Sequence, residues 1–158
     1  TADNEEFCTK FPFHCLVQLN YLDNTEADGF FTSPDIVKTE KIAPDLSDGI
    51  VFPLEKNGSN GFSHMITVGR SANNDVAINS RLVSKFHAYF TWRDEAWFLR
   101  DSGSTNGSFV NKARLDPELY YKVAADDIVA FSKSIVLKFV DPQTLFMQLK
   151  FFRRLSDG

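Results

Sequence analysis

Residues 69–107 read GRSANNDVAINSRLVSKFHAYFTWRDEAWFLRDSGSTNG and, with Ser108, carry three polar clusters in order. The clusters are 69–70 (Gly-Arg), 84–87 (Ser-Lys-Phe-His) and 104–108 (Ser-Thr-Asn-Gly-Ser). Short apolar segments lie around them, at 65–68, 88–92, 97–99 and 109–110. This alternation is typical of an antiparallel β-domain whose strands end in polar loops.

Loops of such a domain bring side chains together where they meet at one end of a sandwich. We therefore expect one small patch formed by Arg70, Ser84, Lys85, Thr105 and Asn106. The patch offers a guanidinium group, an ammonium group, two hydroxyls and a carboxamide, but no carboxylate to act as a base. These groups suit the binding of a phosphate better than the breaking of a bond.

The same three clusters, in this order, resemble the forkhead-associated (FHA) domain, a phosphothreonine-peptide binder. Residues 71–76 (SANNDV) and 97–101 (WFLRD) add to the resemblance, which covers roughly residues 50–140. It implies an all-β fold, an antiparallel β-sandwich of the FHA type. It also implies a module for phosphorylation-dependent protein–protein interaction in signalling, with a phosphothreonine-containing protein or peptide as partner.

The resemblance assigns a role to each candidate residue. Arg70 and Ser84 are expected to bind the phosphate, Thr105 to add a hydroxyl, and Lys85 to contact phosphate or peptide. Asn106 is expected to bond the peptide backbone, although Asn-Gly is also the preferred pair for a tight turn.

The resemblance also implies three structural residues and one further peptide-binding residue. His87 supports the architecture by bonding loop groups, and Gly69 and Gly107 are conformational. FHA domains commonly read the third residue after the phosphothreonine, and Arg81 is placed to pair with an acid there.

A hydrolase is the enzymatic alternative, because Ser84, His87 and Asp101 form a possible triad on paper. However, Ser84 and His87 are three positions apart, about 10 Å in an extended chain. No Gly-x-Ser-x-Gly elbow and no nucleotide-binding glycine pattern is present. We expect no enzyme, no cofactor and no catalytic residue. The competing hypothesis is an FHA-like adaptor that recruits a partner through a phosphate-independent surface.

Composition and charge disfavour several other classes of protein. The 158 residues are 43% hydrophobic, include 16 Phe and carry a net charge of −4, which disfavours a nucleic-acid surface. No apolar run approaches the ~20 residues of a membrane span, and the first residues are unlike a signal peptide. Cys8 and Cys15, even with His14, leave a zinc site one ligand short. We expect no metal, unpaired thiols and an intracellular, cytoplasmic protein.

The pattern divides the chain into an extension (1–49) on or beside the sandwich, an FHA domain (50–141) and a C-terminal helix (142–158). Residues 11–22 contain a plausible strand, and the strand at 50–54 is expected at an edge because Pro53 lacks a ladder donor. Asp141-Pro142 is a favourable start for the helix. The other expected strands are 64–68, 76–78, 87–92, 97–100, 108–111, 119–123, 127–131 and 134–140.

Two threonines of the extension, Thr25 and Thr39, precede an acid and an aliphatic residue, respectively, at the third following position. They are either ordinary polar loop residues or phosphorylation sites. In the second case, self-association through a phosphorylated extension would compete with outside partners.

Overall fold

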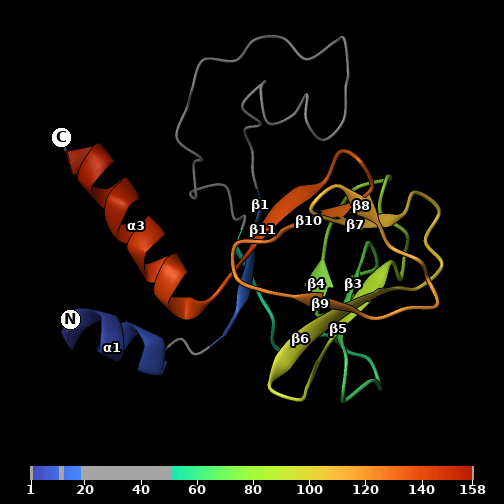
Figure 1. The fold of residues 1–158 in the computed structure, drawn as a ribbon, viewed down its shortest axis with the longest axis horizontal. Coiled ribbons are helices and arrows are strands. Elements are labelled where there is room, and N and C mark those ends of the chain that lie inside the picture. The colour runs from blue at the N-terminus through green and yellow to red at the C-terminus, as the bar shows by residue number, and fades with distance from the viewer. Residues whose placement is uncertain (1, 11–12, 19–50, 158) are drawn as a thin grey trace, which may run out of the picture.

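The computed structural model describes residues 2–10, 13–18 and 51–157. Its strands form two sheets, a six-stranded one in the order β2-β1-β11-β10-β7-β8 and a five-stranded one in the order β4-β3-β5-β6-β9 (Figure 1). The first contains β1 (Cys15–Gln18), β2 (Val51–Pro53), β7 (Ser108–Val110), β8 (Ala113–Arg114), β10 (Ile128–Phe131) and β11 (Val136–Val140). The second contains β3 (Ile66–Gly69), β4 (Val76–Ala77), β5 (Ala88–Arg93), β6 (Ala96–Asp101) and β9 (Tyr121–Val123). The predicted β-sandwich is confirmed.

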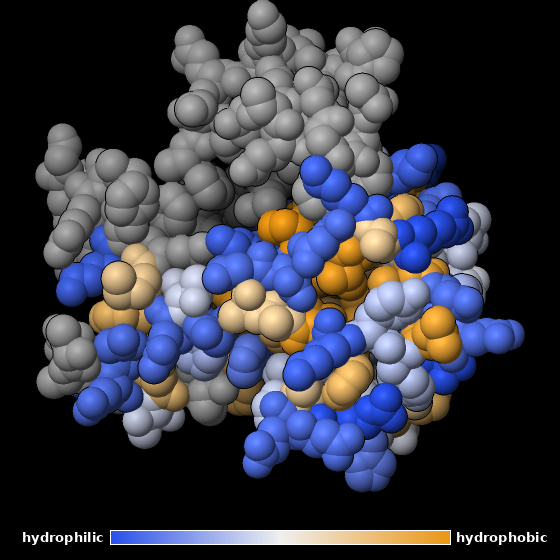
Figure 2. All heavy atoms as spheres, viewed as in Figure 1, coloured by the Kyte–Doolittle hydropathy of each residue, from blue (hydrophilic) through white to orange (hydrophobic). Residues whose placement is uncertain are grey.

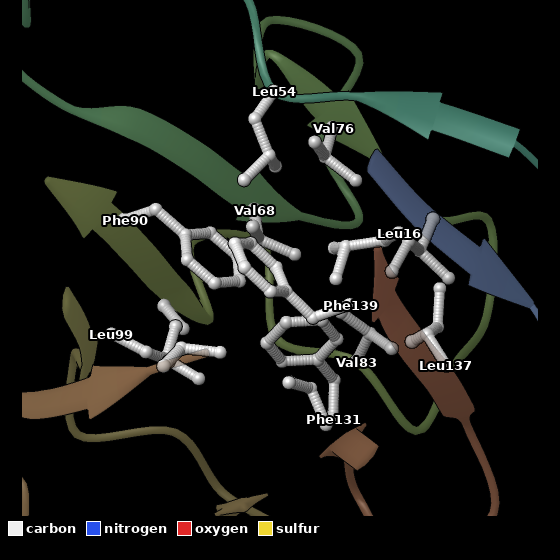
Figure 3. Packing of buried hydrophobic residues seen from close by; sticks show 14 of the residues in the cluster. Leu16, Leu54, Val68, Val76, Val83, Phe90, Leu99, Phe131, Leu137 and Phe139 are labelled. Atoms are coloured by element: carbon white, nitrogen blue, oxygen red, sulfur yellow. The ribbon is translucent and has the colours of Figure 1, made fainter. Parts of the chain in front are cut away.

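Side chains from both sheets meet in one core (Figure 3). Phe90 and Leu99 come from the five-stranded sheet, and Phe131, Leu137 and Phe139 from the six-stranded one; all five are at most 1% exposed. The rings of Phe90 and Phe139 stack across the sandwich with their centroids 6.1 Å apart. Truncating such a buried ring to Ala typically costs about 3–5 kcal/mol. The core thus holds the two sheets, and the loops between their strands, in a fixed relation.

Every strand predicted from residue 50 onward has an observed counterpart, with ends that agree within two residues. As predicted from Pro53, β2 lies at an outer edge of its sheet. Neighbouring strands pair antiparallel except β3 and β4, which pair parallel through Val68–Val76 and Gly69–Ala77. The two-residue β8 was not predicted, because both of its residues are exposed and give no apolar alternation.

The segment before residue 50 contributes a strand to the sandwich. β1 lies between β2 and β11, with Cys15 opposite both Pro53 and Val140. It falls within the predicted 11–22 segment, and Cys15, Leu16 and Val17 are buried. The domain limits at residues 50 and 142 stay predictions, and Thr25 and Thr39 lie outside the described residues.

Two helices, α1 (Ala2–Lys10) and α3 (Pro142–Asp157), lie beside each other at one side of the sandwich (Figure 1). The predicted C-terminal helix is confirmed, and the Asp141 carboxylate caps it by accepting the Thr144 N–H at 2.6 Å. Leu145 is buried against Val140, and the rings of Phe7 and Phe146 join the helices at 5.3 Å. The sequence analysis did not predict α1. No helix in the described part of the chain is long and apolar enough to cross a membrane.

Cys8 and Cys15 are both free thiols. Cys15 is fully buried in the sheet, and burial, aided by the nearby Glu55 charge, raises the pKa of its thiol to about 12. Within the described residues, no group of His, Cys, Asp and Glu has the arrangement of a metal site. On the face seen in Figure 2, hydrophilic residues cover most of the described surface and several hydrophobic residues reach it between them.

Candidate functional site

Three loops meet at one end of the sandwich, at residues 70–75, 78–87 and 102–107. They form an open pocket of about 340 Å³. All six residues that were predicted to contact phosphate or peptide line it, together with Leu82 and Val83: Arg70, Arg81, Ser84, Lys85, Thr105 and Asn106. The structure therefore brings the whole predicted set together.

The backbone joins the first two loops directly. The N–H of Arg70 donates to the carbonyl oxygen of Ser84 at 2.9 Å, and the N–H of Ser71 donates to that of Lys85 at 3.3 Å. Gly69 makes this approach possible, because a Cβ at that position would lie 2.2 Å from the Lys85 oxygen. The exposed Arg70 side chain is thereby anchored beside Ser84.

Side chains join the second loop to the third. Ser84 Oγ accepts a hydrogen bond from the backbone N–H of Thr105 at 3.1 Å. The carboxamide nitrogen of Asn106 donates to the carbonyl oxygen of Leu82 at 2.8 Å. No described residue donates to the carboxamide oxygen of Asn106, so that acceptor is available to a ligand. The Ser84 hydroxyl likewise keeps its proton for donation.

His87 lies beneath the pocket and is fully buried. Its Nδ1 accepts the Ser84 N–H at 3.0 Å, so its proton is on Nε2, which donates to the carbonyl oxygen of Gly107 at 2.8 Å. Burial lowers the pKa of His87, while the Gly107 bond and the Asp101 charge act in the opposite direction. A neutral imidazole therefore connects the loops that carry Ser84 and Asn106.

Asp101 shapes the third loop, a role that the sequence analysis did not foresee. Its carboxylate accepts the N–H groups of Gly103 and Ser104, each at 2.9 Å, and the hydroxyls of Ser104 and Ser108, each at 2.6 Å. Burial acts to raise the pKa of Asp101, but the bonds from Ser104 and Ser108 lower it below its ordinary value. An Asp directly before Ser-Gly-Ser is the available sequence signal, since Asp side chains bond the backbone of a following turn.

The contacts of Ser84, His87 and Asp101 are not those of a catalytic triad. The expected distance of about 10 Å between Ser84 and His87 was wrong. The chain turns between them, and the two residues are hydrogen bonded. However, the imidazole meets the backbone N–H of Ser84 and not its hydroxyl. The other ring nitrogen faces Gly107, with Asp101 Oδ1 4.0 Å away.

Asp75 is a second buried carboxylate that holds the first loop in place, and the sequence analysis did not predict its role. Asp75 accepts Lys56 Nζ at 2.7 Å, the N–H of Gly58 at 2.8 Å and the N–H of Thr67 at 2.9 Å. Burial opposes ionisation, but these donors lower the pKa of Asp75 to about 2. Next to it, the Asn74 side chain donates to the carbonyl oxygen of Lys85 at 2.7 Å.

The pocket is positively charged in an acidic protein. The chain has a net charge of −4, yet no carboxylate lines this pocket. Within the described residues, Arg70, Arg81 and Lys85 form no ion pair. Among the described residues, the site thus holds three cations without an acidic partner, neutral donors from Ser84 and Thr105, and an acceptor on Asn106.

Comparison with known proteins finds similarity to one type of domain. The sequence model of the FHA domain matches residues 66–132, the part that carries the pocket residues 70–106. The probable E3 ubiquitin-protein ligase dma1 of Schizosaccharomyces pombe is 36% identical over 42 residues, which are 27% of this chain and 16% of that protein. The chain thus matches only a small part of this curated relative's length.

Solved structures share the fold. The FHA domain of an Arabidopsis thaliana hypothetical protein superposes with a TM-score of 0.55 at 22% identity, covering 82% of this chain and 85% of that one. Mycobacterium tuberculosis EmbR, solved in complex with a low-affinity phosphopeptide, gives a TM-score of 0.54 at 16% identity, covering 82% of this chain and 24% of EmbR. The resemblance drawn from the sequence motifs is confirmed.

Proposed function

We propose that the FHA domain which this chain contains binds phosphothreonine segments of other proteins and performs no chemistry on them. FHA domains are interaction modules. The observation that carries the proposal is the single pocket lined by Arg70, Ser84, Lys85 and Thr105, without a carboxylate among its lining residues. A phosphate carries a charge of about −1.5 to −2 and three acceptor oxygens, which such a set of donors complements.

Each side chain has a distinct task in this proposal. The Arg70 guanidinium binds two phosphate oxygens at once, because its planar fork matches their geometry. Lys85 adds a point charge without directional geometry. The Ser84 hydroxyl, whose oxygen already accepts the Thr105 N–H, donates its proton to the phosphate. The Thr105 hydroxyl supplies a further donor.

The loops are already held in place before a ligand arrives. The bonds from Arg70 N–H to Ser84, from Thr105 N–H to Ser84 Oγ and from Asn106 to Leu82 lie directly around the pocket. Preorganised groups lose little conformational entropy on binding, so more of the contact energy appears as affinity. The free carboxamide oxygen of Asn106 is then the acceptor for a peptide N–H.

Specificity along the peptide is assigned to Arg81. It lines the pocket and forms no ion pair within the described part of the chain. We assign it to an acidic side chain at the third position after the phosphothreonine. The phosphopeptide bound to EmbR, whose fold is similar, supports the general mode of binding.

A second surface favours a phosphate-independent partner as the alternative function. The rings of Phe62 and Phe86 stack at 5.9 Å, and Phe86 and Tyr89 at 6.3 Å, along the outside of the five-stranded sheet. Phe62 is 50% exposed. Phe86 is 38% exposed, whereas Tyr89 is buried beside it. An exposed aromatic pair such as Phe62 and Phe86 is typical of protein interfaces.

One titration decides between the two functions. A phosphopeptide library first identifies a binding sequence, and that peptide is then titrated in phosphothreonine, phosphoserine and unmodified threonine forms by isothermal calorimetry. Measurable affinity that requires the phosphate supports the proposal. Equal affinity with and without phosphate would reject phosphothreonine binding in favour of the aromatic surface. In that case Phe86→Ala should weaken binding of the peptide.

A further inference from the structure

The five-stranded sheet has an outer face that carries a cationic and aromatic surface. Alternate residues of β5, β6 and β9 point away from the core, because Phe90, Leu99 and Val123 of the same strands point into it. The outward-facing residues of these strands, here called the outer sheet face, are Tyr89, Thr91, Arg93, Ala96, Phe98, Arg100 and Lys122. They include three cations and no acid.

The cations of this face are packed against aromatic rings. Tyr120 directly precedes β9, and its hydroxyl lies 2.9 Å from that of Tyr89. The guanidinium carbon of Arg93 lies 4.4 Å from the centre of the Tyr120 ring and 4.6 Å from that of Phe98. The guanidinium carbon of Arg100 lies 4.9 Å from the Tyr120 ring. Groups that are fixed in advance lose little entropy when a partner binds.

The charge of the outer sheet face has no acidic counterpart. In the described part of the chain, Arg93, Arg100 and Lys122 form no ion pair, although the chain as a whole has a net charge of −4. Asp94 and Glu95, the nearest acids in sequence, form the exposed turn after Arg93 and do not pair with it. Clustered cations repel one another, and an acidic partner relieves this repulsion. Tyr, Phe and Arg are also the residues enriched in protein interfaces.

The outer sheet face begins beside the phosphate pocket. The ring of Phe86 stacks on that of Tyr89 at 6.3 Å, and its neighbour Lys85 lines the pocket. From His87, beneath the pocket, β5 leads away to Arg93, a distance of about 20 Å in an extended strand. A bound phosphoprotein therefore meets this face with a segment that lies roughly six to ten residues from its phosphothreonine.

We propose that the outer sheet face binds an acidic segment of the same protein whose phosphothreonine occupies the pocket. The proposal rests on the phosphothreonine function of that pocket. Carboxylates of the segment pair with Arg93, Arg100 and Lys122, and its apolar side chains pack beside Phe98 and Tyr120. The two contacts act together, because binding of the phosphothreonine raises the effective concentration of the acidic segment.

Single-stranded nucleic acid is the other anionic polymer that binds sheets with aromatic and basic residues. Such binding needs ring faces that are open to the bases. Here the guanidinium group of Arg93 already packs on the rings of Phe98 and Tyr120. The packing therefore favours a protein segment, which supplies carboxylates to the guanidinium groups without displacing them from the rings.

Extended phosphopeptides, titrated by isothermal calorimetry against the whole chain, test the proposal. A library-selected phosphothreonine peptide carries a flexible linker of about six Gly and Ser residues, followed by a segment of Asp, Glu and Leu. The linker and segment are attached at the N-terminal end in one series and at the C-terminal end in the other. On one side, we expect about threefold to tenfold higher affinity than with a matched segment of Asn, Gln and Leu. That gain should be lost in Arg93→Gln and reduced in Arg100→Gln.

Matched variants separate this face from general charge attraction. Lys138→Gln removes a cation from β11 of the other sheet, where its pairing with Asp126 at 3.5 Å contributes little, and should keep the gain. Arg93→Lys keeps the charge but loses the planar group, so it should recover only part of the gain. Because Arg93 is exposed, its variants should fold and should bind the neutral peptide normally.

Three outcomes would overturn the proposal. The first is no gain on either side, or a gain that survives both Arg93→Gln and Arg100→Gln; either leaves phosphothreonine binding intact. The second is binding of a single-stranded oligothymidylate that requires Arg93, without a gain from the acidic segment, which would assign the face to nucleic acid. The third is failure of the neutral phosphopeptide to bind, in which case the proposed function falls and the combined mode of binding falls with it.

Discussion

His87 Nε2 lies 2.8 Å from the carbonyl oxygen of Gly107, and the opposite ring nitrogen accepts the N–H of Ser84. One neutral imidazole therefore spans the two loops that carry the candidate phosphate ligands. Protonation of Nδ1 would place its N–H against the Ser84 N–H, so the positive form does not fit this arrangement. The arrangement of the pocket loops thereby depends on a histidine that is itself fully buried.

The stability of the domain should fall as the pH is lowered below about 6.5, the ordinary pKa of histidine. Because burial lowers the pKa of His87 in the folded state, the unfolded chain binds the proton more readily. This contribution to the free energy of unfolding is complete above about pH 6.5 and is lost as the pH falls toward the folded pKa. Urea denaturation across this range measures it. The pKa of His14 is also lowered, so His14→Gln serves as the control, and His87→Gln should flatten the remaining pH dependence.

Replacing Arg70 by Ala should weaken phosphopeptide binding about tenfold to over a hundredfold, since a charge-assisted contact is worth about 1.5–3 kcal/mol. Arg70→Lys should recover part of the affinity, because charge remains while the bidentate fork is lost. The Arg70 side chain is exposed, so the melting temperature should change little. Unchanged affinity in Arg70→Ala would exclude this pocket as the phosphate site.

Phosphothreonine should bind more tightly than phosphoserine in otherwise identical peptides. Leu82 lines the pocket, is 43% exposed and offers an apolar contact to the threonine methyl group. Burying one methyl is worth about 0.8 kcal/mol, or about fourfold in affinity. Competition binding with the two peptides measures the ratio, and equal affinities would mean that no such contact forms.

Asp101→Asn should destabilise the domain by about 1–3 kcal/mol and weaken phosphopeptide binding. The new amide cannot accept all the hydrogen bonds that the carboxylate takes from Gly103, Ser104 and Ser108, and buried donors without partners are costly. Asp126→Asn is the matched control, since that carboxylate is 63% exposed and its pairing with Lys138 at 3.5 Å contributes little. Similar losses in both variants, by urea denaturation, would contradict the role of Asp101.

The sequence was sufficient for features that depend on neighbours along the chain. Apolar alternation located the strands from residue 50 onward, Asp141-Pro142 located the start of α3, and the polar clusters located the loops around Arg70 and Asn106. These signals are local, because side-chain direction alternates within a strand and capping acts within one helical turn.

Outside the predicted pocket, only the tertiary structure decided which distant segments meet. Cys15 pairs with Val140 in the middle of a sheet, Arg114 packs on Gly107, and Asp75 binds Lys56. In each case the partner is selected by the packing of the whole sandwich and not by spacing or periodicity. Asp101 combines both kinds of information. Its hydrogen bonds join residues that are close in sequence, but the tertiary structure buries its carboxylate among the donors of the 102–107 loop. Segments that are distant in sequence become neighbours because the two sheets bury their inner faces in one core. That burial depends on the whole sequence and not on any single stretch of it.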